Sequence, residues 1–126
     1  MSDEEVLRAY EKYGPAELVA EARRYLEAAR EEADPRRKAE KGYLAATLAA
    51  DAFILWKGFQ RPRSLYERER MLGKLDPNWE KDYVLYVERL YRRCLCDGAC
   101  DGKEIDSTLE ELRAFIGRVE REVRGG

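Results

Sequence analysis

The sequence predicts an all-α protein, an up-down antiparallel bundle of four main helices with two short ones. The first observation behind this is the stretch 42–58, where only Thr47 and Asp51 are polar between residues 43 and 56. A helix that is apolar nearly all the way round must be covered on most sides by other helices. The second is a series of segments with apolar residues at helical spacing. The third is that no segment alternates polar and apolar residues as a strand does.

Length and composition narrow the class of protein. The 126 residues predict one domain, with a short helix in residues 1–14 and the bundle in residues 15–124. A net charge of −2 provides no general attraction to nucleic acid or anionic lipid. Charged residues make up 40 %, and Gln60 and Asn78 are the only side-chain amides, a bias typical of thermophilic proteins. The chain shows no signal segment and its apolar run is too short to span a bilayer, so we expect a cytoplasmic location and no membrane.

The first two helices are marked by their start signals. Ser2 and Glu5 have the spacing of a capping box and predict a short helix that stops at Gly14. Pro15 opens the second helix, because the first helical position needs no backbone N–H. The buried face of this helix is predicted at Leu18, Ala22, Tyr25, Leu26 and Ala29.

An Asp-Pro pair at residues 34–35 predicts the start of the central helix, and Gly58 predicts its left-handed end. Because the connection before it is very short, the second and third helices should form an antiparallel hairpin. Ser64 and Glu67 form a second capping box and predict a short helix that ends near Gly73.

A second Asp-Pro pair, at residues 76–77, predicts a long helix that runs to about Cys96. Two Asp-Gly turn signals predict a loop over residues 97–106. Ser107 and Glu110 form a third capping box, which predicts the start of the final helix. The apolar seam of that helix should pack on the bundle and is formed by Leu109, Leu112, Ile116, Val119 and Val123.

Histidine is absent from the chain. This removes His-based catalytic triads, imidazole acid–base catalysis and the Glu-x-x-His ligands of carboxylate-bridged metal bundles. We therefore expect no catalytic residue, no cofactor and no enzymatic activity.

Asp51 is the one ionisable residue in the central apolar run. A buried carboxylate is costly unless it is paired or hydrogen-bonded. Thr47 lies one turn earlier and could donate to it, and a tyrosine or an arginine from another helix could complete the set. We favour a structural acid, which should tolerate Asp51→Asn at a cost of about 1–2 kcal/mol, over a ligand-binding role.

Charge is uneven along the chain. Residues 57–74 hold six cations and two acids, a balance of +4: Lys57, Arg61, Arg63, Arg68, Arg70 and Lys74 against Glu67 and Glu69. Residues 97–111 hold six acids and one lysine, a balance of −5. The basic segment could meet phosphates while Phe59 and Tyr66 stack on bases. Solvated faces, or self-association between the two segments, are equally compatible with the pattern.

Cys94, Cys96 and Cys100 form a C-x-C-x3-C cluster. Zinc usually takes four ligands, so three thiols are one short unless Asp97, Asp101 or a second subunit adds one. Cys94 lies on an apolar stripe and is interpreted as a small core residue. We rank that buried thiol, with a Cys96–Cys100 disulfide or free thiols, ahead of a metal site.

A short basic connection, a long helix, an Asp-Gly turn and a final helix follow residues 39–58, which read AEKGYLAATLAADAFILWKG. This arrangement resembles the HEPN superfamily, most closely its small stand-alone archaeal PaREP-like members, over about residues 17–123. The resemblance implies an antiparallel helical bundle that is often dimeric. Some members of the superfamily are ribonucleases, and others partner nucleotidyltransferases.

The nuclease members carry an arginine, four to six residues and then a histidine. The nearest match in this chain runs from Arg89 to Cys94, with a cysteine at the histidine position. The resemblance therefore favours a homodimeric, non-catalytic interaction module, with a nucleotidyltransferase-type protein as a possible partner. An RNA- or nucleotide-binding protein that uses residues 57–74 is the alternative, and a thiol metal or redox protein is the third hypothesis.

Overall fold

The structure is a computed structural model, and it describes residues 3–125. Within that range the chain is helical and contains no strand, so the predicted all-α bundle is confirmed. The elements in chain order are α1 (Asp3–Arg8), α2 (Pro15–Glu31), α3 (Pro35–Trp56), α4 (Leu65–Leu75), α5 (Pro77–Tyr86), the π-helical segment η1 (Val87–Cys96) and α6 (Gly102–Gly125).

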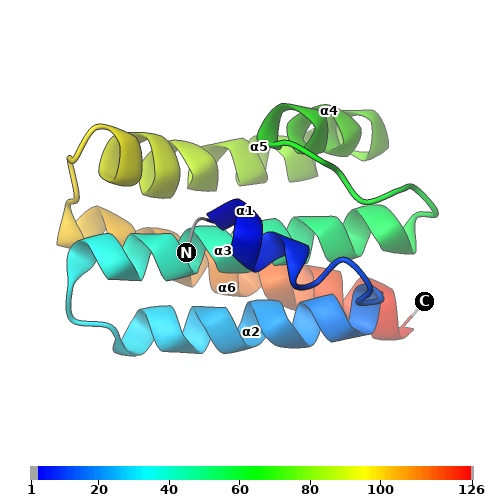
Figure 1. Ribbon diagram of the computed structural model, residues 1–126, viewed down its shortest axis with the longest axis horizontal. Helices are drawn as coiled ribbons and strands as arrows, with labels where there is room; N and C mark the ends of the chain where they lie inside the picture. Colours follow the sequence, from blue (N-terminus) through cyan, green and yellow to red (C-terminus); the bar gives the residue numbers. More distant parts are fainter. Residues whose placement is uncertain (1–2, 126) are drawn as a thin grey trace.

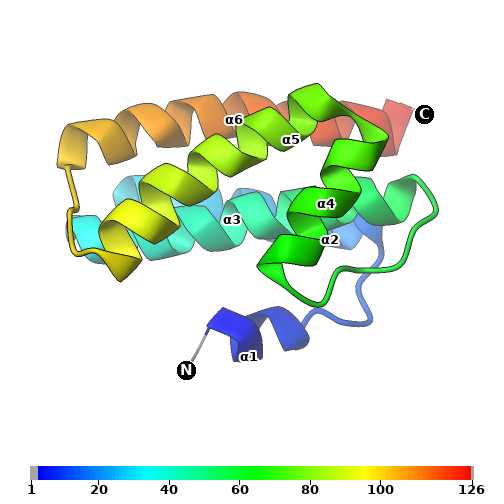
Figure 2. The ribbon, with the colours of Figure 1, turned by 90° about the horizontal axis from the view of Figure 1, so that it is seen from above.

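Helix α3 is the centre of the molecule (Figure 1). It contacts α2 along most of its length, and α6, η1, α4, α5 and α1 contact its other sides. The predicted antiparallel hairpin of α2 and α3 is present, with only residues 32–34 between the two helices. Seen from above, α5 crosses obliquely over α3 and α6, while α1 lies on the opposite side of α3 from α6 (Figure 2).

The apolar circumference of α3 explains this central position. Its residues are buried without interruption from Gly42 to Ile54. At Gly42 an added Cβ would lie 2.7 Å from Leu109 Cδ2 and 3.2 Å from Leu90 Cδ1. The missing side chain therefore lets α6 and η1 approach α3 closely at this point.

Three of the predicted start signals act as helix caps. The Asp34 carboxylate accepts a hydrogen bond from the Arg37 amide at 3.0 Å, and Asp76 accepts one from Asn78 at 2.9 Å. The Ser64 hydroxyl accepts from the Glu67 amide at 3.1 Å, which is half of the predicted capping box. Gly58 has φ +91° directly after α3, the left-handed end that was predicted.

Several predicted boundaries are wrong. The first helix ends at Arg8 and does not reach Gly14, while Ser2 of the predicted capping box lies outside the described residues. Helix α4 continues past Gly73 to Leu75. Helix α6 begins at Gly102 and not at Ser107, because the Asp101 carboxylate accepts from the backbone amides of the first turn, at 2.9 and 3.3 Å.

The predicted long helix to Cys96 is present, but its second half has the wider turn of a π-helix. The burial of Val87, Leu90 and Cys94 fits the ordinary α-helical steps of three and four, so the residue pattern contains no sign of the change. Tyr91, on the same segment, stacks on Tyr43 of α3 with ring centroids 4.7 Å apart.

The predicted seam of α6 packs within this chain. Leu109, Leu112, Ile116 and Val119 are at most 1 % exposed, and Val123 is partly buried. Homodimerisation remains a prediction, but this seam no longer supports it, because the bundle already covers it. No helix in residues 3–125 is both long enough and apolar enough to cross a bilayer.

Candidate functional site

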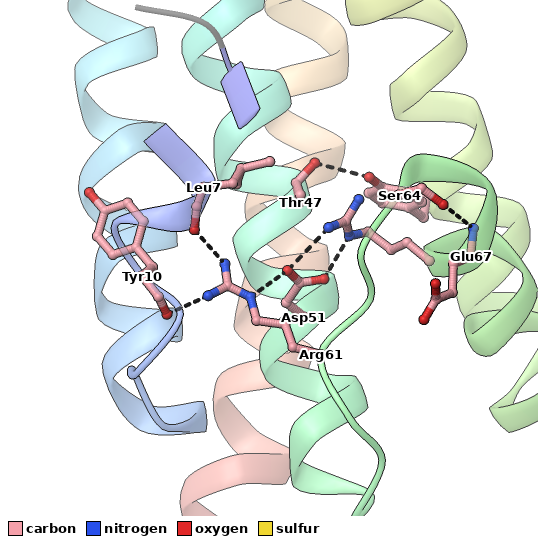
Figure 3. A network of polar contacts seen from close by, with 9 residues as sticks. Leu7, Tyr10, Thr47, Asp51, Arg61, Ser64 and Glu67 are labelled. Atoms are coloured by element: carbon pink, nitrogen blue, oxygen red, sulfur yellow. Dashed lines mark hydrogen bonds and ion pairs between the residues drawn. The ribbon is translucent and has the colours of Figure 1, made fainter. Parts of the chain in front are cut away.

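The first candidate site is a buried charge cluster around Asp51, in the middle of α3. Arg68 of α4 donates from Nε to Asp51 Oδ1 at 2.6 Å and from Nη2 to Oδ2 at 3.3 Å. Arg61, from the loop between α3 and α4, donates from Nε to Oδ2 at 2.9 Å (Figure 3). Asp51 is fully buried, and the arginine side chains are only 14 % (Arg61) and 5 % (Arg68) exposed. The carboxylate is thus paired inside the fold.

The loop and the N-terminus of α4 bring these arginines to Asp51. The chain turns back after Gly58, and the buried Pro62 holds the segment that follows Arg61 against the bundle. The Ser64 cap then starts α4, so that Arg68 lies one turn inside the helix and faces α3. The sequence signal for this arrangement is the two helix-breaking residues on either side of Arg61, Gly58 and Pro62, which turn the chain back toward Asp51.

Arg61 also attaches the N-terminal segment to the bundle. Its Nη2 donates to the Leu7 carbonyl at 3.3 Å, and its Nη1 donates to the Tyr10 carbonyl (Figure 3). Leu7 lies in the last turn of α1 and Tyr10 lies two residues beyond its end, and each carbonyl also accepts a backbone N–H, from Tyr10 and Tyr13 respectively. One guanidinium therefore connects α1, the loop and α3.

The cluster has more positive than negative charge. One carboxylate faces two guanidiniums, so the sum is +1. Burial alone would lower the pKa of Arg68, but the adjacent Asp51 carboxylate has the opposite effect and raises that pKa above its ordinary value. Arg68 therefore remains charged.

Thr47 does not bond to Asp51, which corrects the predicted pairing. Its hydroxyl is 2.9 Å from the hydroxyl of Tyr83 on α5, and both side chains are fully buried. Burial raises the pKa of Tyr83, against the opposing effect of the nearby Arg68. The two buried hydroxyls satisfy each other.

A cavity of about 530 Å³ opens above the cluster. Residues of α1, of the segment after it, of the loop before α4 and of the cluster line this cavity: Leu7, Arg8, Glu11, Asp51, Arg61, Pro62, Arg63 and Arg68. Four of them are arginines and two are acids. We call this space the arginine cavity.

The second candidate site is a hollow of about 420 Å³ on the outer side of α4. Its lining combines aromatic, cationic and polar side chains: Phe59, Ser64, Tyr66, Glu67, Arg70, Met71 and Lys74. Phe59 is 49 % and Tyr66 72 % exposed. The only other large apolar side chain exposed among the described residues is Trp56, at 38 %, close by in sequence. We call this region the aromatic-basic surface.

The predicted six-cation patch is therefore divided. Arg61 and Arg68 point inward to Asp51, so their prediction as patch residues was wrong. Arg63, Arg70 and Lys74 are exposed, and no ion pair within residues 3–125 neutralises them. The outward cations lie along the loop and the outer side of α4.

The acidic segment 97–111 is largely neutralised within the chain. Ion pairs join Arg93 to Glu104, Lys38 to Asp106, Arg30 to Glu110 and Arg89 to Glu111, at 2.9, 2.7, 3.5 and 2.6 Å. Few free acids remain there to meet the basic segment of a second copy.

Arg89 is held away from the basic segment. Its Nη1 donates to Glu111 Oε2 at 2.6 Å and lies 3.5 Å from the Thr108 hydroxyl, both on α6. The structure thus places the arginines singled out in the sequence in four positions. Arg61 and Arg68 lie in the buried cluster, Arg63 in the loop beside the arginine cavity, Arg70 in the aromatic-basic surface, and Arg89 at the contact between η1 and α6.

The cysteine pairing also differs from the prediction. The disulfide joins Cys94 to Cys100, and Cys96 is free and exposed. The bridge ties the end of η1 to the residues just before α6. Two of the three candidate zinc thiols are consumed by it, and within residues 3–125 no group of three or more acids or cysteines is arranged to hold a metal ion.

Comparison of the chain with known protein families, curated proteins and solved structures finds no significant match in any of the three. The resemblance to the HEPN superfamily therefore rests on residues 39–58 and the order of helices alone.

Proposed function

We propose that this chain is a non-catalytic helical interaction module, which binds a protein partner carrying an acidic surface through the aromatic-basic surface. The observation that carries this proposal is the grouping of Phe59 and Tyr66, both strongly exposed, with Arg70 and Lys74 around one hollow. Aromatic residues, methionine and arginine are the types enriched in protein interfaces, and tyrosine and arginine dominate their binding energy.

The charge distribution supports an acidic partner. The cations of the aromatic-basic surface, Arg70 and Lys74, have no counter-ion in the described chain, whereas the acids of residues 97–111 mostly do. Unneutralised charge next to exposed aromatic rings steers a partner of opposite sign. A symmetric homodimer on this surface would bring the same cations together, so the predicted homodimer would use another face.

The proposed absence of catalysis rests on Arg89 and Cys94, the two ends of the nearest match to the nuclease motif. Cys94 is buried and in a disulfide, so no thiolate is available as a base. Arg89 is already paired with Glu111. A cytoplasmic location and a thermophilic source belong to this proposal as expectations from the composition of the sequence. An archaeal source and a nucleotidyltransferase-type partner are the expectations that accompany the HEPN-like arrangement.

Site-specific photo-crosslinking tests the proposal. A benzophenone side chain at position 66 should yield a discrete adduct with one protein in the cells of origin. The matched control carries it at Ala20, an exposed residue of α2 on the opposite side of α3 from α4 (Figure 1). Arg70→Glu in the same protein should abolish the adduct. Equal adducts at both positions, or an adduct that survives Arg70→Glu, would contradict the proposal.

Single-stranded RNA is the second candidate partner. The same observation favours it, because exposed rings beside cations allow stacking on bases with phosphate contacts. Fluorescence anisotropy with a labelled oligoribonucleotide separates the two candidates. An RNA partner predicts affinity that falls steeply with salt and is lost in Tyr66→Ala; a protein partner predicts no such binding.

A further inference from the structure

The arginine cavity carries an inference that is independent of the aromatic-basic surface. We propose that it binds the phosphoryl group of a small molecule, with Arg61 at its floor and Arg63 at its rim as the contacting cations. This site lies on the side of the loop that faces α1, and the interaction proposed above does not require it.

The first argument is charge. Arg61 and Arg68 share the single carboxylate of Asp51, which leaves one positive charge largely shielded from water. A buried charge without a counter-ion is costly. Around the cluster the lining adds Arg8, Arg63 and Glu11, so its cations outnumber its acids. This balance favours an anion, and the phosphate dianion carries more charge to match it than a carboxylate or a chloride does.

The second argument is donor capacity. A guanidinium has five N–H groups. Arg61 uses one on Asp51, one on the Leu7 carbonyl and one on the Tyr10 carbonyl. These bonds orient its plane, and its remaining N–H groups lie on a side chain that is 14 % exposed and lines the cavity. A planar donor fixed in this way suits the tetrahedral oxygens of phosphate.

The third argument is the place of Arg63 and the size of the space. Arg63 follows the buried Pro62, is exposed, and makes no ion pair with any described residue, so it can turn to a bound anion without breaking a bond. The cavity volume of about 530 Å³ is in the range of small-molecule pockets and exceeds the needs of a bare phosphate ion. The remaining room would hold the organic part of a phosphomonoester.

Binding of inorganic phosphate and of a phosphomonoester, ribose 5-phosphate, to the full chain by titration calorimetry tests this inference. We expect at least one to bind the wild type at constant ionic strength. Arg63→Ala should weaken that binding by about tenfold, as expected for the loss of one charged hydrogen bond. Arg121→Ala is the matched control, because Arg121 is an exposed arginine of α6 that makes no ion pair with a described residue and lines neither the arginine cavity nor the aromatic-basic surface; it should leave the affinity unchanged.

Both variants change exposed side chains, so both should fold, and their helical circular dichroism should match that of the wild type. The inference is overturned if neither phosphate compound binds, if Arg63→Ala and Arg121→Ala weaken binding equally, or if acetate at the same ionic strength binds as well as phosphate. The first result would show that the excess charge is simply hydrated, and the other two would show general ionic attraction in place of a site.

Discussion

Replacing Asp51 by asparagine removes the one negative charge that Arg61 and Arg68 share. The change is nearly isosteric, so it leaves the packing of α3 intact. It converts a paired cluster into two guanidiniums of the same sign, and three N–H···O contacts with a carboxylate are lost or weakened. Removing one partner of a buried ion pair costs about 3–5 kcal/mol. We therefore expect a loss in this range, larger than the loss of about 1–2 kcal/mol that the sequence alone predicts for Asp51→Asn at a structural acid.

The assay is equilibrium unfolding in urea, which does not screen charge as guanidinium chloride does. Arg61→Met provides the comparison, because it leaves Asp51 and Arg68 as a neutral pair. It also removes the hydrogen bonds to the Leu7 and Tyr10 carbonyls, so it should cost about 2–3 kcal/mol. We therefore expect Asp51→Asn to lower the free energy of unfolding by more than Arg61→Met does. An Asp51→Asn cost below that of Arg61→Met would refute the shared-carboxylate account.

Three further predictions concern the disulfide, alkaline pH and RNA. The double variant Cys94→Ala/Cys100→Ala should lose about 2 kcal/mol of the free energy of unfolding in urea, because the bridge closes a short loop with a separation of six residues. Cys96→Ser, at the free exposed cysteine, should leave that free energy unchanged. Equal effects of the two changes would contradict the observed pairing. Burial raises the folded-state pKa of Tyr83 and Tyr86. Their contribution to stability should therefore be complete below about pH 10 and should fall as pH rises toward the folded pKa, because unfolded tyrosines ionise first. Tyr86→Phe should reduce the loss of unfolding free energy between about pH 9 and 11. An unchanged loss in that variant would count against this explanation. Purified protein should not cleave single-stranded RNA in a gel assay, and cleavage that disappears in Arg89→Ala would show that a catalytic site has been missed.

The helices that could be predicted are those whose signals are local. Asp34 and Ser64 cap helices as their spacing indicates, and the apolar circumference of residues 43–56 correctly predicts a covered central helix. The start of α6 was missed because Asp101 and Ser107 are both plausible caps. Only the burial of Ile105 against the bundle selects the earlier one.

The candidate sites were less predictable because they depend on contacts distant in the sequence. A carboxylate in an apolar helix indicates that it needs a partner, but not that the partners are Arg61 and Arg68, 10 and 17 residues away. The basic segment appeared uniform in sequence, since nothing in its spacing shows which arginines turn inward. The wrong cysteine pairing has the same cause, because the turn at Gly98 and not the spacing brings Cys100 to Cys94.

The central claim is that the basic segment 57–74 divides into two inward arginines and a set of outward cations that are free to bind. Limited modification of the native protein with phenylglyoxal, followed by mass spectrometry of peptides cut at acidic residues, tests it directly. The account predicts rapid modification of Arg63 and Arg70, slow modification of Arg61 at the floor of the arginine cavity, and protection of Arg68 until the protein is unfolded in urea. Equal reactivity of all four arginines in the native protein would contradict the division, and with it both the buried cluster and the proposed binding surfaces.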